Sequence, residues 1–281
     1  MVQDERSMKL AFSTLGCPDW TLEQIISSAV ACGYDGIEFR GIGEHVELYE
    51  SPHFSSPESI RATRARLEAI KLEAACADSS VHMAQSMAQQ PRQSIDTVKR
   101  YVDIAHQLGA PRVRVFGGAT PEGMSFDEVV QQVSEDLRTC AEYAQSAGVT
   151  IVLETHDAFT SSAKVQRVLK EADHPRARAL WDLHHPYAAE GETPKDSVHY
   201  LLNYIDYTHV KDSVLGEDGK RRYVLTGEGD VPLPTMVNIL REIGYDGYLS
   251  FEWEKRWHPT LEDPAVAFPH SSTTIKEMIS V

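Results

Sequence analysis

The fold of this chain is decided by four strand-like runs in its second half: IVLETH (151–156), LWDLHH (180–185), YTHVKD (207–212) and LSFEWE (249–254). Each run is apolar and ends beside a side chain that can bind a metal ion: Glu154, Asp182, His209 and Glu252. These residues are 28, 27 and 43 positions apart. A (β/α)₈ barrel uses roughly 30 residues for each strand–helix unit. Two spacings therefore match one unit each, and the third matches one unit plus an insertion.

The rest of the chain repeats the same alternation of strand and helix. Helix signals include the capping box from Ser125 to Glu128 and Pro57 in the first turn after Ser56. The predicted strands are 9–16, 36–40, 73–80, 113–118, 149–156, 178–185, 205–212 and 248–255. The predicted helices are 21–33, 56–71, 94–110, 125–148, 161–171, 195–203, 233–245 and a closing helix at 271–279. The pattern predicts an α/β protein, a (β/α)₈ TIM barrel that forms a single domain over residues 1–281.

Two features bear on the competing architectures. A doubly wound open sheet is the alternative, but the turn after the first strand, GCPDW (16–20), is not a G-x-G-x-x-G phosphate-binding turn. The stretch 213–232 is rich in glycine and charge and too polar for a core. We expect it to be an insertion at the barrel mouth, either a loop or a hairpin.

Composition limits the partners. The 281 residues include 42% hydrophobic residues, which suffices for a large core, and carry a formal charge of −15. Such an acidic chain repels phosphate backbones and anionic membranes, so neither nucleic acid nor a membrane is expected as a partner. The four cysteines form no C-x-x-C pair, and the chain opens with the polar stretch MVQDERSM. We therefore expect reduced thiols, no signal peptide and a cytoplasmic location; whether the chain forms a homo-oligomer stays open.

The four strand-end residues suit one divalent metal ion. Three carboxylates aimed at one point repel each other, and a cation relieves that repulsion. An oxygen-rich set with one imidazole favours Mn²⁺, with Mg²⁺, Co²⁺ and Zn²⁺ as alternatives. The cation would polarise a carbonyl or hydroxyl group, and Glu154 and Glu252 could move protons on either face of a sugar. The competing interpretation is that each acidic residue only ends a strand or forms an ion pair.

Basic side chains next to these ligands are candidates for substrate binding: His156, His184, His185 and Lys211. Lys211 shares a strand face with His209, and His156 shares one with Glu154, because alternate residues of a strand point the same way. A structural role remains open for each, and for Lys211 it would be a salt bridge to Asp212 or Glu154.

Weaker candidates follow other strands. Glu38 could orient a neighbour or form an ion pair, and the glycines of Phe116–Gly117–Gly118 could admit a ligand or form a turn. His82 follows the third strand. The basic segment 219–222 could reach an anionic substrate or be a solvated loop. Three tryptophans could stack on a sugar or fill the core: Trp20, Trp253 and Trp257.

Taken together, these motifs resemble the sugar phosphate isomerase/epimerase family of the xylose isomerase-like TIM barrel superfamily. The resemblance runs from about residue 9 to about residue 260. It is carried by LETH, WDLHH, HVKD, SFEWE, the GEGD of 227–230 and the opening LGCPDW and GYDGIE.

The resemblance implies a metal site with roles for particular residues. A Mn²⁺-type ion would be held by Glu154, Asp182, His209 and Glu252, with the two glutamates as the acid/base pair and His185 binding the substrate. The family's usual arginine after the seventh-strand histidine is not at its expected spacing, so Arg221 or Arg222 would take its place. The three-metal site of endonuclease IV is not expected, because 213–232 holds no D-x-H.

Three functions follow as hypotheses. The first is a metal-dependent isomerase or epimerase that acts on a small-molecule sugar. The second is a lyase or dehydratase that acts on an inosose or 3-keto sugar with the same metal. The third is a non-catalytic sugar-binding barrel subunit. The sequence does not decide which sugar is bound or whether it is phosphorylated.

Overall fold

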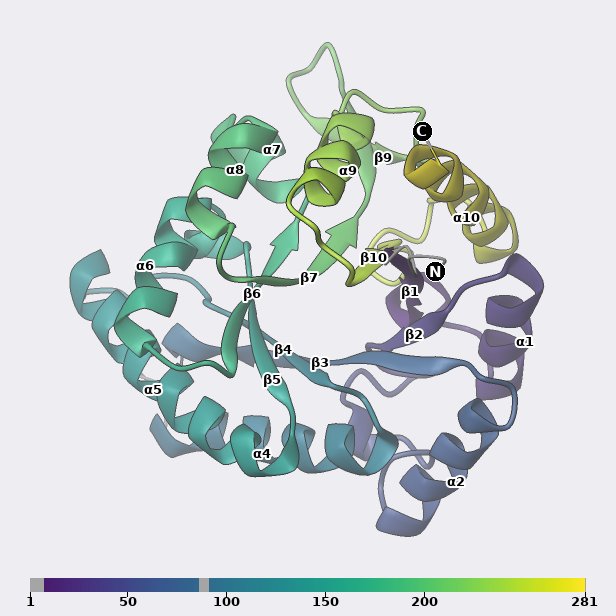
Figure 1. The fold of residues 1–281 in the computed structure, drawn as a ribbon, viewed down its shortest axis with the longest axis horizontal. Helices are drawn as coiled ribbons and strands as arrows, with labels where there is room; N and C mark the ends of the chain where they lie inside the picture. Colours follow the sequence, from purple (N-terminus) through teal and green to yellow (C-terminus); the bar gives the residue numbers. More distant parts are fainter. Residues whose placement is uncertain (1–7, 86–90, 281) are drawn as a thin grey trace, which may run out of the picture.

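Eight parallel strands close into a barrel, which confirms the predicted fold class (Figure 1). The structure, a computed structural model, describes residues 8–85 and 91–280, so the polar opening stretch 1–7 lies outside it. Around the barrel the strands follow chain order, and β10 closes the ring between β7 and β1. The barrel strands are β1 Lys9–Ser13, β2 Gly36–Phe39, β3 Glu73–His82, β4 Arg112–Phe116, β5 Thr150–Glu154, β6 Ala177–Asp182, β7 Ile205–Val210 and β10 Tyr248–Phe251.

Helices surround the barrel (Figure 1). The capping box predicted at Ser125 is confirmed, since its Oγ accepts a hydrogen bond from the Glu128 backbone N–H while the Glu128 carboxylate accepts one from the Ser125 N–H. Ser56 caps α2 as predicted. The helices are α1 Leu22–Cys32, α2 Pro57–Glu68, α4 Pro91–Leu108, α5 Phe126–Ala147, α6 Ser162–Ala172, α7 His185–Glu190, α8 Pro194–Leu201, α9 Leu233–Glu242 and α10 Pro264–Ser280.

Several element ends differ from the prediction, and one helix was not predicted. The first strand ends at Ser13, because Thr14–Gly16 turns into the short 3₁₀ helix η1, where a Cβ on Gly16 would lie 2.9 Å from the ring of Phe268. The closing helix begins at Pro264 rather than at residue 271 and continues through Pro269. The short helix α7 was not predicted: the strand expected over 178–185 ends at Asp182, and α7 begins at His185, the last residue of the DLHH motif.

The insertion after the seventh strand is a hairpin. Strands β8 (Asp212–Leu215) and β9 (Arg221–Val224) pair antiparallel, apart from the barrel sheet. Asp212 is buried, and its carboxylate accepts hydrogen bonds from the backbone N–H groups of Gly227 and Gly229. This carboxylate therefore fastens the end of the insertion to the barrel.

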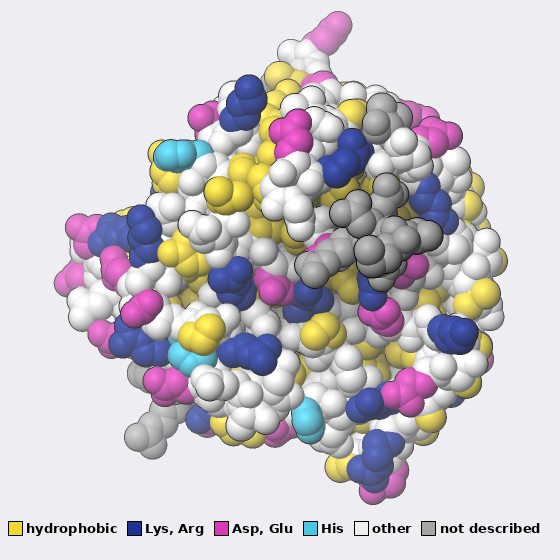
Figure 2. Space-filling view, viewed as in Figure 1, with side chains coloured by type: hydrophobic (Ala, Val, Ile, Leu, Met, Phe, Trp, Pro, Cys, Tyr) yellow, Lys and Arg dark blue, Asp and Glu magenta, His cyan; other side chains and the backbone are white. Residues whose placement is uncertain are grey.

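Charged side chains of both signs are mixed on the surface shown in Figure 2. On the face shown in Figure 2, Lys and Arg side chains are interspersed with Asp and Glu rather than gathered into one basic patch. Within 8–85 and 91–280, no helix is both long and apolar enough to cross a membrane.

Candidate functional site

The four predicted metal ligands meet at one rim of the barrel. Glu154 and Asp182 are the last residues of β5 and β6, His209 is the next-to-last residue of β7, and Glu252 directly follows β10. Ligand atoms of these residues all lie within 4.8 Å of one another, and all four side chains are buried. Asp182 and His209 are partners in the β6–β7 register, so parallel pairing alone brings them side by side. Side chains at the C-terminal ends of barrel strands converge in this way.

His209 is held so that one ring nitrogen faces the carboxylates. Its Nε2 donates a hydrogen bond to Glu38 Oε2 at 3.0 Å, and Ser250 Oγ donates to the same oxygen at 2.8 Å. Its Nδ1 is buried, has no hydrogen-bond partner, and lies 3.4 Å from Glu252 Oε2 and 3.5 Å from Glu154 Oε1. A carboxylate behind a ligating histidine fixes the tautomer and ring orientation. Of the two roles predicted for Glu38, the orienting one is the one the geometry supports.

Asp182 is oriented by the chain that follows it. Its Oδ1 accepts hydrogen bonds from the backbone N–H groups of His184 and His185, at 2.8 and 3.0 Å, at the start of α7. Its Oδ2 is left facing the site, 3.9 Å from His209 Nδ1. The DLHH motif therefore orients the carboxylate through backbone donors as well as supplying imidazoles.

Lys211 is enclosed by acidic side chains. Its ammonium lies 2.8 Å from Asp182 Oδ2 and 3.0 Å from Glu254 Oε1, and it also donates to Glu252. The ion pairs considered from sequence, with Asp212 or Glu154, do not form: Asp212 instead accepts from the 227–229 backbone. The reason is that Lys211 lies beyond the end of β7, level with Glu252 rather than Glu154. The lysine therefore balances the charge of two candidate ligands.

The buried site gathers ionisable groups of both signs. Burial opposes ionisation of Glu252, but His209 and Lys211 hold its pKa well below the usual range. Burial also opposes protonation of His209, yet the charges of Glu252, Glu38 and Glu154 raise its pKa well above the usual value. The buried carboxylates here are Glu38, Asp78, Glu154, Asp182 and Glu252, and the buried cations are Arg40, Arg114 and Lys211. Burial and the charge of Glu38 raise the pKa of Asp78 to about 8, so the remaining four carboxylates are nearly balanced near pH 7 by the three cations and a protonated His209. It is the donor set, carboxylate oxygens with one imidazole nitrogen aimed among them, that suits a divalent cation.

The three predicted histidines form a patch beside the ligands. His185 Nδ1 lies 3.4 Å from Asp182 Oδ2 and donates to the backbone oxygen of Thr155 at 3.2 Å. His156 packs edge-on against His185 with ring centres 4.8 Å apart. His184 is hydrogen-bonded to Ser213 Oγ at 2.8 Å, and burial lowers its pKa to about 3, so it is neutral near pH 7. His185 and His156 are thus beside the candidate ligands, and His184 links the site to the hairpin.

Arg222 occupies a different place from the one expected of a substrate-binding residue. Its side chain is 59% exposed and pairs with Asp218 within the hairpin. Arg221 points toward the barrel instead. It donates a hydrogen bond to Ser213 Oγ at 3.1 Å, and the same hydroxyl group is hydrogen-bonded to His184. Of the two arginines considered from sequence, the position of Arg221 is the better suited to the site.

The weaker candidates divide between site and core. A Cβ on Gly117 would lie 2.1 Å from the ring of Phe159, and Gly118 has a φ of +87°, so packing and the turn require these glycines. Trp253 is buried and donates to the backbone oxygen of Glu262, whereas Trp257 is 51% exposed and lines the mouth. Trp20 packs against Phe268.

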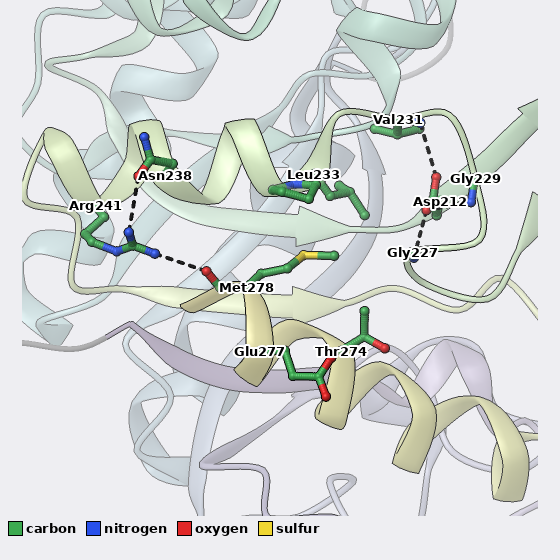
Figure 3. A pocket seen from close by; sticks show the side chains of 11 residues that line it. Asp212, Gly227, Gly229, Val231, Leu233, Asn238, Arg241, Thr274, Glu277 and Met278 are labelled. Atoms are coloured by element: carbon green, nitrogen blue, oxygen red, sulfur yellow. Dashed lines mark hydrogen bonds between the residues drawn. The ribbon is translucent and has the colours of Figure 1, made fainter. Parts of the chain in front are cut away.

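Two cavities differ in what lines them. The cavity at the mouth has a volume of about 270 Å³. It is lined by Leu15, Arg40, His82, Arg114, Phe116, Glu154, His156, Glu252, Glu254 and Trp257. A larger cavity of about 590 Å³ lies between α9, α10 and the 227–231 loop (Figure 3). It is lined by none of the four candidate ligands, whereas Glu154 and Glu252 line the smaller cavity at the mouth.

Three charged residues of the mouth were not singled out from sequence: Arg40, Arg114 and Glu254. Strand alternation could have found two of them. Arg40 follows Glu38 by two, and Glu254 follows Glu252 by two, so each shares a face with a candidate site residue. Arg114 stands in the otherwise apolar run VRVF, where a charged side chain within a buried strand is itself a signal.

Comparison with known proteins identifies the family. The family model described as xylose isomerase-like TIM barrel matches residues 26–277. The chain belongs to this family. The resemblance found in its motifs is thereby confirmed.

Named relatives are similar across nearly the whole chain. Fructoselysine 3-epimerase of Shigella flexneri is 23% identical over 263 residues, which cover 87% of this chain and 90% of that protein. The solved structure of IOLI protein with a bound zinc atom matches with a TM-score of 0.79 and 18% identity, covering 97% and 98% of the two chains. The probable 3-DHS dehydratase AsbF from Bacillus anthracis matches with a TM-score of 0.78 and 19% identity, covering 96% and 99%. The relative's name agrees with the expectation of an enzyme of the sugar isomerase and epimerase class.

Proposed function

We propose that this protein is a divalent-metal-dependent isomerase or epimerase that acts on a keto or hydroxy sugar. The observation that carries the proposal is the buried Nδ1 of His209, which has no hydrogen-bond partner and faces Glu154, Asp182 and Glu252. A buried polar atom without a partner is costly unless a ligand satisfies it. The same four residues would hold the ion, with Mn²⁺ favoured and Mg²⁺, Co²⁺ or Zn²⁺ as alternatives.

When bound, the ion would polarise the sugar carbonyl and so acidify the neighbouring C–H group. Glu154 and Glu252 stand on strands that are separated by β6 and β7, so they approach the mouth from two sides. In the proposal one glutamate removes the proton from that carbon and the other returns a proton. Lys211 stabilises the ionised form of Glu252 through its contact with that carboxylate.

Other residues would bind and orient the sugar. His156 lines the mouth cavity, and the ring of His185 packs against the ring of His156. Both are therefore placed to bind hydroxyl groups of the sugar. His184 and Lys211 would support the site indirectly. His184 does so through its hydrogen bond to Ser213, and Lys211 through its ion pairs with the carboxylates that enclose it. In the hairpin, Arg221 replaces Arg222 as the proposed contact to this side of the site.

The relatives support this proposal and keep one alternative. An epimerase is among the relatives by sequence, and a zinc-bound protein and a probable dehydratase share the fold. A dehydratase would use the same metal and one glutamate as base, so the residues alone do not separate the two reactions. The mass of the product distinguishes the two reactions.

The first experiment measures metal content. Purified protein, analysed by inductively coupled plasma mass spectrometry, should contain about one equivalent of a divalent metal, and Glu154→Gln should lose it. Glu242→Gln is a matched control, because Glu242 lies on α9 and accepts a hydrogen bond from Asn238 away from the site. If neither wild type nor control retained metal after reconstitution, the proposal would be wrong and a non-catalytic barrel would replace it.

The second experiment identifies the reaction. Metal-loaded protein is incubated in D₂O with a panel of ketoses, inososes and 3-keto sugars, and products are analysed by mass spectrometry. An isomerase or epimerase incorporates deuterium from solvent and otherwise keeps the composition of the substrate. A dehydratase yields a product lighter by one water. Products of the second kind alone would reject epimerisation in favour of the lyase.

A further inference from the structure

A buried arginine without a carboxylate partner lies in the wall of the mouth cavity. Arg40 directly follows β2 and is 6% exposed. Its Nη1 donates to the backbone oxygen of Val46 at 3.1 Å, and its Nη2 donates to Ser80 Oγ at 2.9 Å. Both acceptors are neutral, and no ion pair joins Arg40 to a carboxylate among residues 8–85 and 91–280. A buried cation is normally paired, so this arrangement needs an explanation.

A second buried arginine presents donors to the same cavity. Arg114 of β4 is 1% exposed and donates through Nη2 to Asp78 at 3.2 Å. Its Nε lies 3.5 Å from Glu154 Oε2, its Nη1 is buried and has no hydrogen-bond partner, and its guanidinium lies over the ring of Phe116 at 3.8 Å. Arg40 and Arg114 both line the mouth cavity, with His82 beside them. Two guanidinium groups thus face one small volume with donors to spare.

The electrostatics and the topology agree. Burial lowers the pKa of Arg40, and the positive charge of Arg114 lowers it further, while Asp78 and Glu47 act in the opposite direction. An anion between the two arginines would favour the charged form of Arg40. In the closed ring, β2 lies opposite β6, and β4 lies opposite β10. Arg40 therefore faces Asp182 across the mouth, and Arg114 faces Glu252 while it contacts Glu154 on the neighbouring strand β5. A ligand with its carbonyl end at the four candidate ligands would extend its other end toward the arginines.

We propose that the substrate is a sugar acid, whose anionic oxygen group binds to Arg40 and Arg114 on the β2–β4 side of the mouth. This inference rests on the proposed function and names its substrate class. Guanidinium groups bind carboxylates through paired hydrogen bonds, which suits the free donors of this pair. A cavity of about 270 Å³ is small for a drug-sized ligand and suits a single sugar unit. A phosphate ester shares the anionic chemistry, and the experiment distinguishes the two.

The test uses three ligands with one carbon skeleton and different terminal groups: D-fructose, D-fructuronate and D-fructose 6-phosphate. Binding to the metal-loaded protein is measured by isothermal titration calorimetry. Wild type should bind fructuronate at least about tenfold more tightly than fructose, as expected for charge-assisted hydrogen bonds. Arg40→Gln should bring that ratio to about one while the affinity for fructose changes by no more than about twofold. Arg40→Lys should retain part of the preference, because the charge remains without the planar fork.

Controls separate binding from folding. Arg61→Gln removes a positive charge from the surface of α2, where Arg61 pairs with Glu58, and should leave all three affinities unchanged. Metal content of each variant shows whether the site is intact. If Arg40 only ties Val46 and Ser80 together, Arg40→Gln should weaken all three ligands equally.

The outcomes are separable. A preference for fructuronate that Arg40→Gln abolishes supports the sugar acid, and the same pattern with fructose 6-phosphate assigns the anionic subsite to a phosphate ester. Equal affinity of wild type for all three ligands, or equal weakening by Arg40→Gln, overturns the inference. Fructose turnover without discrimination would reject the anionic subsite alone. A metal-loaded protein that neither binds nor converts any ketose would reject the proposed function, and the inference with it.

Discussion

Two arcs of the same barrel are built from the same strand and helix units and carry different chemistry. The arc from β5 to β10 ends in Glu154, Asp182, His209 and Glu252, which converge within 4.8 Å. The arc from β2 to β4 carries Arg40 and Arg114, whose guanidinium groups line the opposite wall. The first arc concentrates ligand oxygens, and the second concentrates donors. The barrel shape therefore sets where side chains point, and a few strand-end residues set the charge of each side.

The two arcs are also joined beneath the mouth. Glu38 of β2 accepts a hydrogen bond from His209 of β7, and Arg114 of β4 lies 3.5 Å from Glu154 of β5. One acidic and one basic side chain of the arginine arc thus contact candidate ligands of the metal arc. Neither arc is therefore structurally independent of the other. Variants in each arc should show which of its residues contribute to metal binding, to turnover and to stability.

The largest effect is expected in the metal arc. Glu154→Gln and Glu252→Gln each remove a candidate ligand and a proton-transfer group, so turnover should fall by about 10²- to 10⁴-fold. Steady-state kinetics with a substrate found in the D₂O screen, together with metal analysis, measures this. Glu242→Gln serves as control. Full activity in both site variants would show that the division into arcs is wrong.

The next effect concerns the lysine within the metal arc. Lys211→Met keeps length but leaves Asp182, Glu252 and Glu254 without their buried cation. Removing one partner of a buried pair costs about 3–5 kcal/mol. We expect a loss of this size in urea unfolding with a chelator present, and a smaller loss with metal added, because the cation compensates the carboxylates. An equal loss in both conditions would mean that metal and lysine do not share these charges.

A smaller effect, on metal affinity, is expected when the hydrogen bond between Glu38 and His209, which joins the two arcs, is removed. Glu38→Ala removes the acceptor of His209 Nε2–H, and loss of such a supporting group weakens metal affinity by about 10- to 100-fold. Glu38→Gln should recover part of it, because its amide oxygen still accepts that hydrogen bond. Competition with a chelator of known affinity measures both variants. An unchanged metal affinity in Glu38→Ala would show that Glu38 does not orient His209 for a metal ion and only forms an ion pair inside the barrel.

The smallest effect should lie outside both arcs. Ser125→Ala removes the N-cap of α5 and should cost about 1 kcal/mol. Chemical denaturation should give the same loss with and without metal, and metal content should not change. A loss that depended on metal would extend the coupling beyond the rim.

The sequence predicted the barrel because its repeat is local. Strand-like runs, helix periodicity and caps such as Ser125–Glu128 occur at intervals that match one βα unit, and all of these are readable along the chain. Errors fell at element ends. The stretch after Ser13 bends into η1, where Gly16 packs closely against Phe268, a residue more than 250 positions away. Such a boundary depends on a distant contact and is not visible locally.

The same distinction holds for the candidate site. Glu154, Asp182, His209 and Glu252 could be named from sequence because each ends a strand, and parallel strands bring their ends to one rim. The residues that hold these side chains in place could not be named from sequence. Which carboxylate faces His209 Nε2, which acids enclose Lys211, and which arginine of the hairpin points inward depend on the closure of the ring and on side-chain packing. Residue types and their spacing along the chain determined the candidate ligands; only the tertiary structure, by bringing β2 opposite β6, decided what surrounds them and what stands across the mouth.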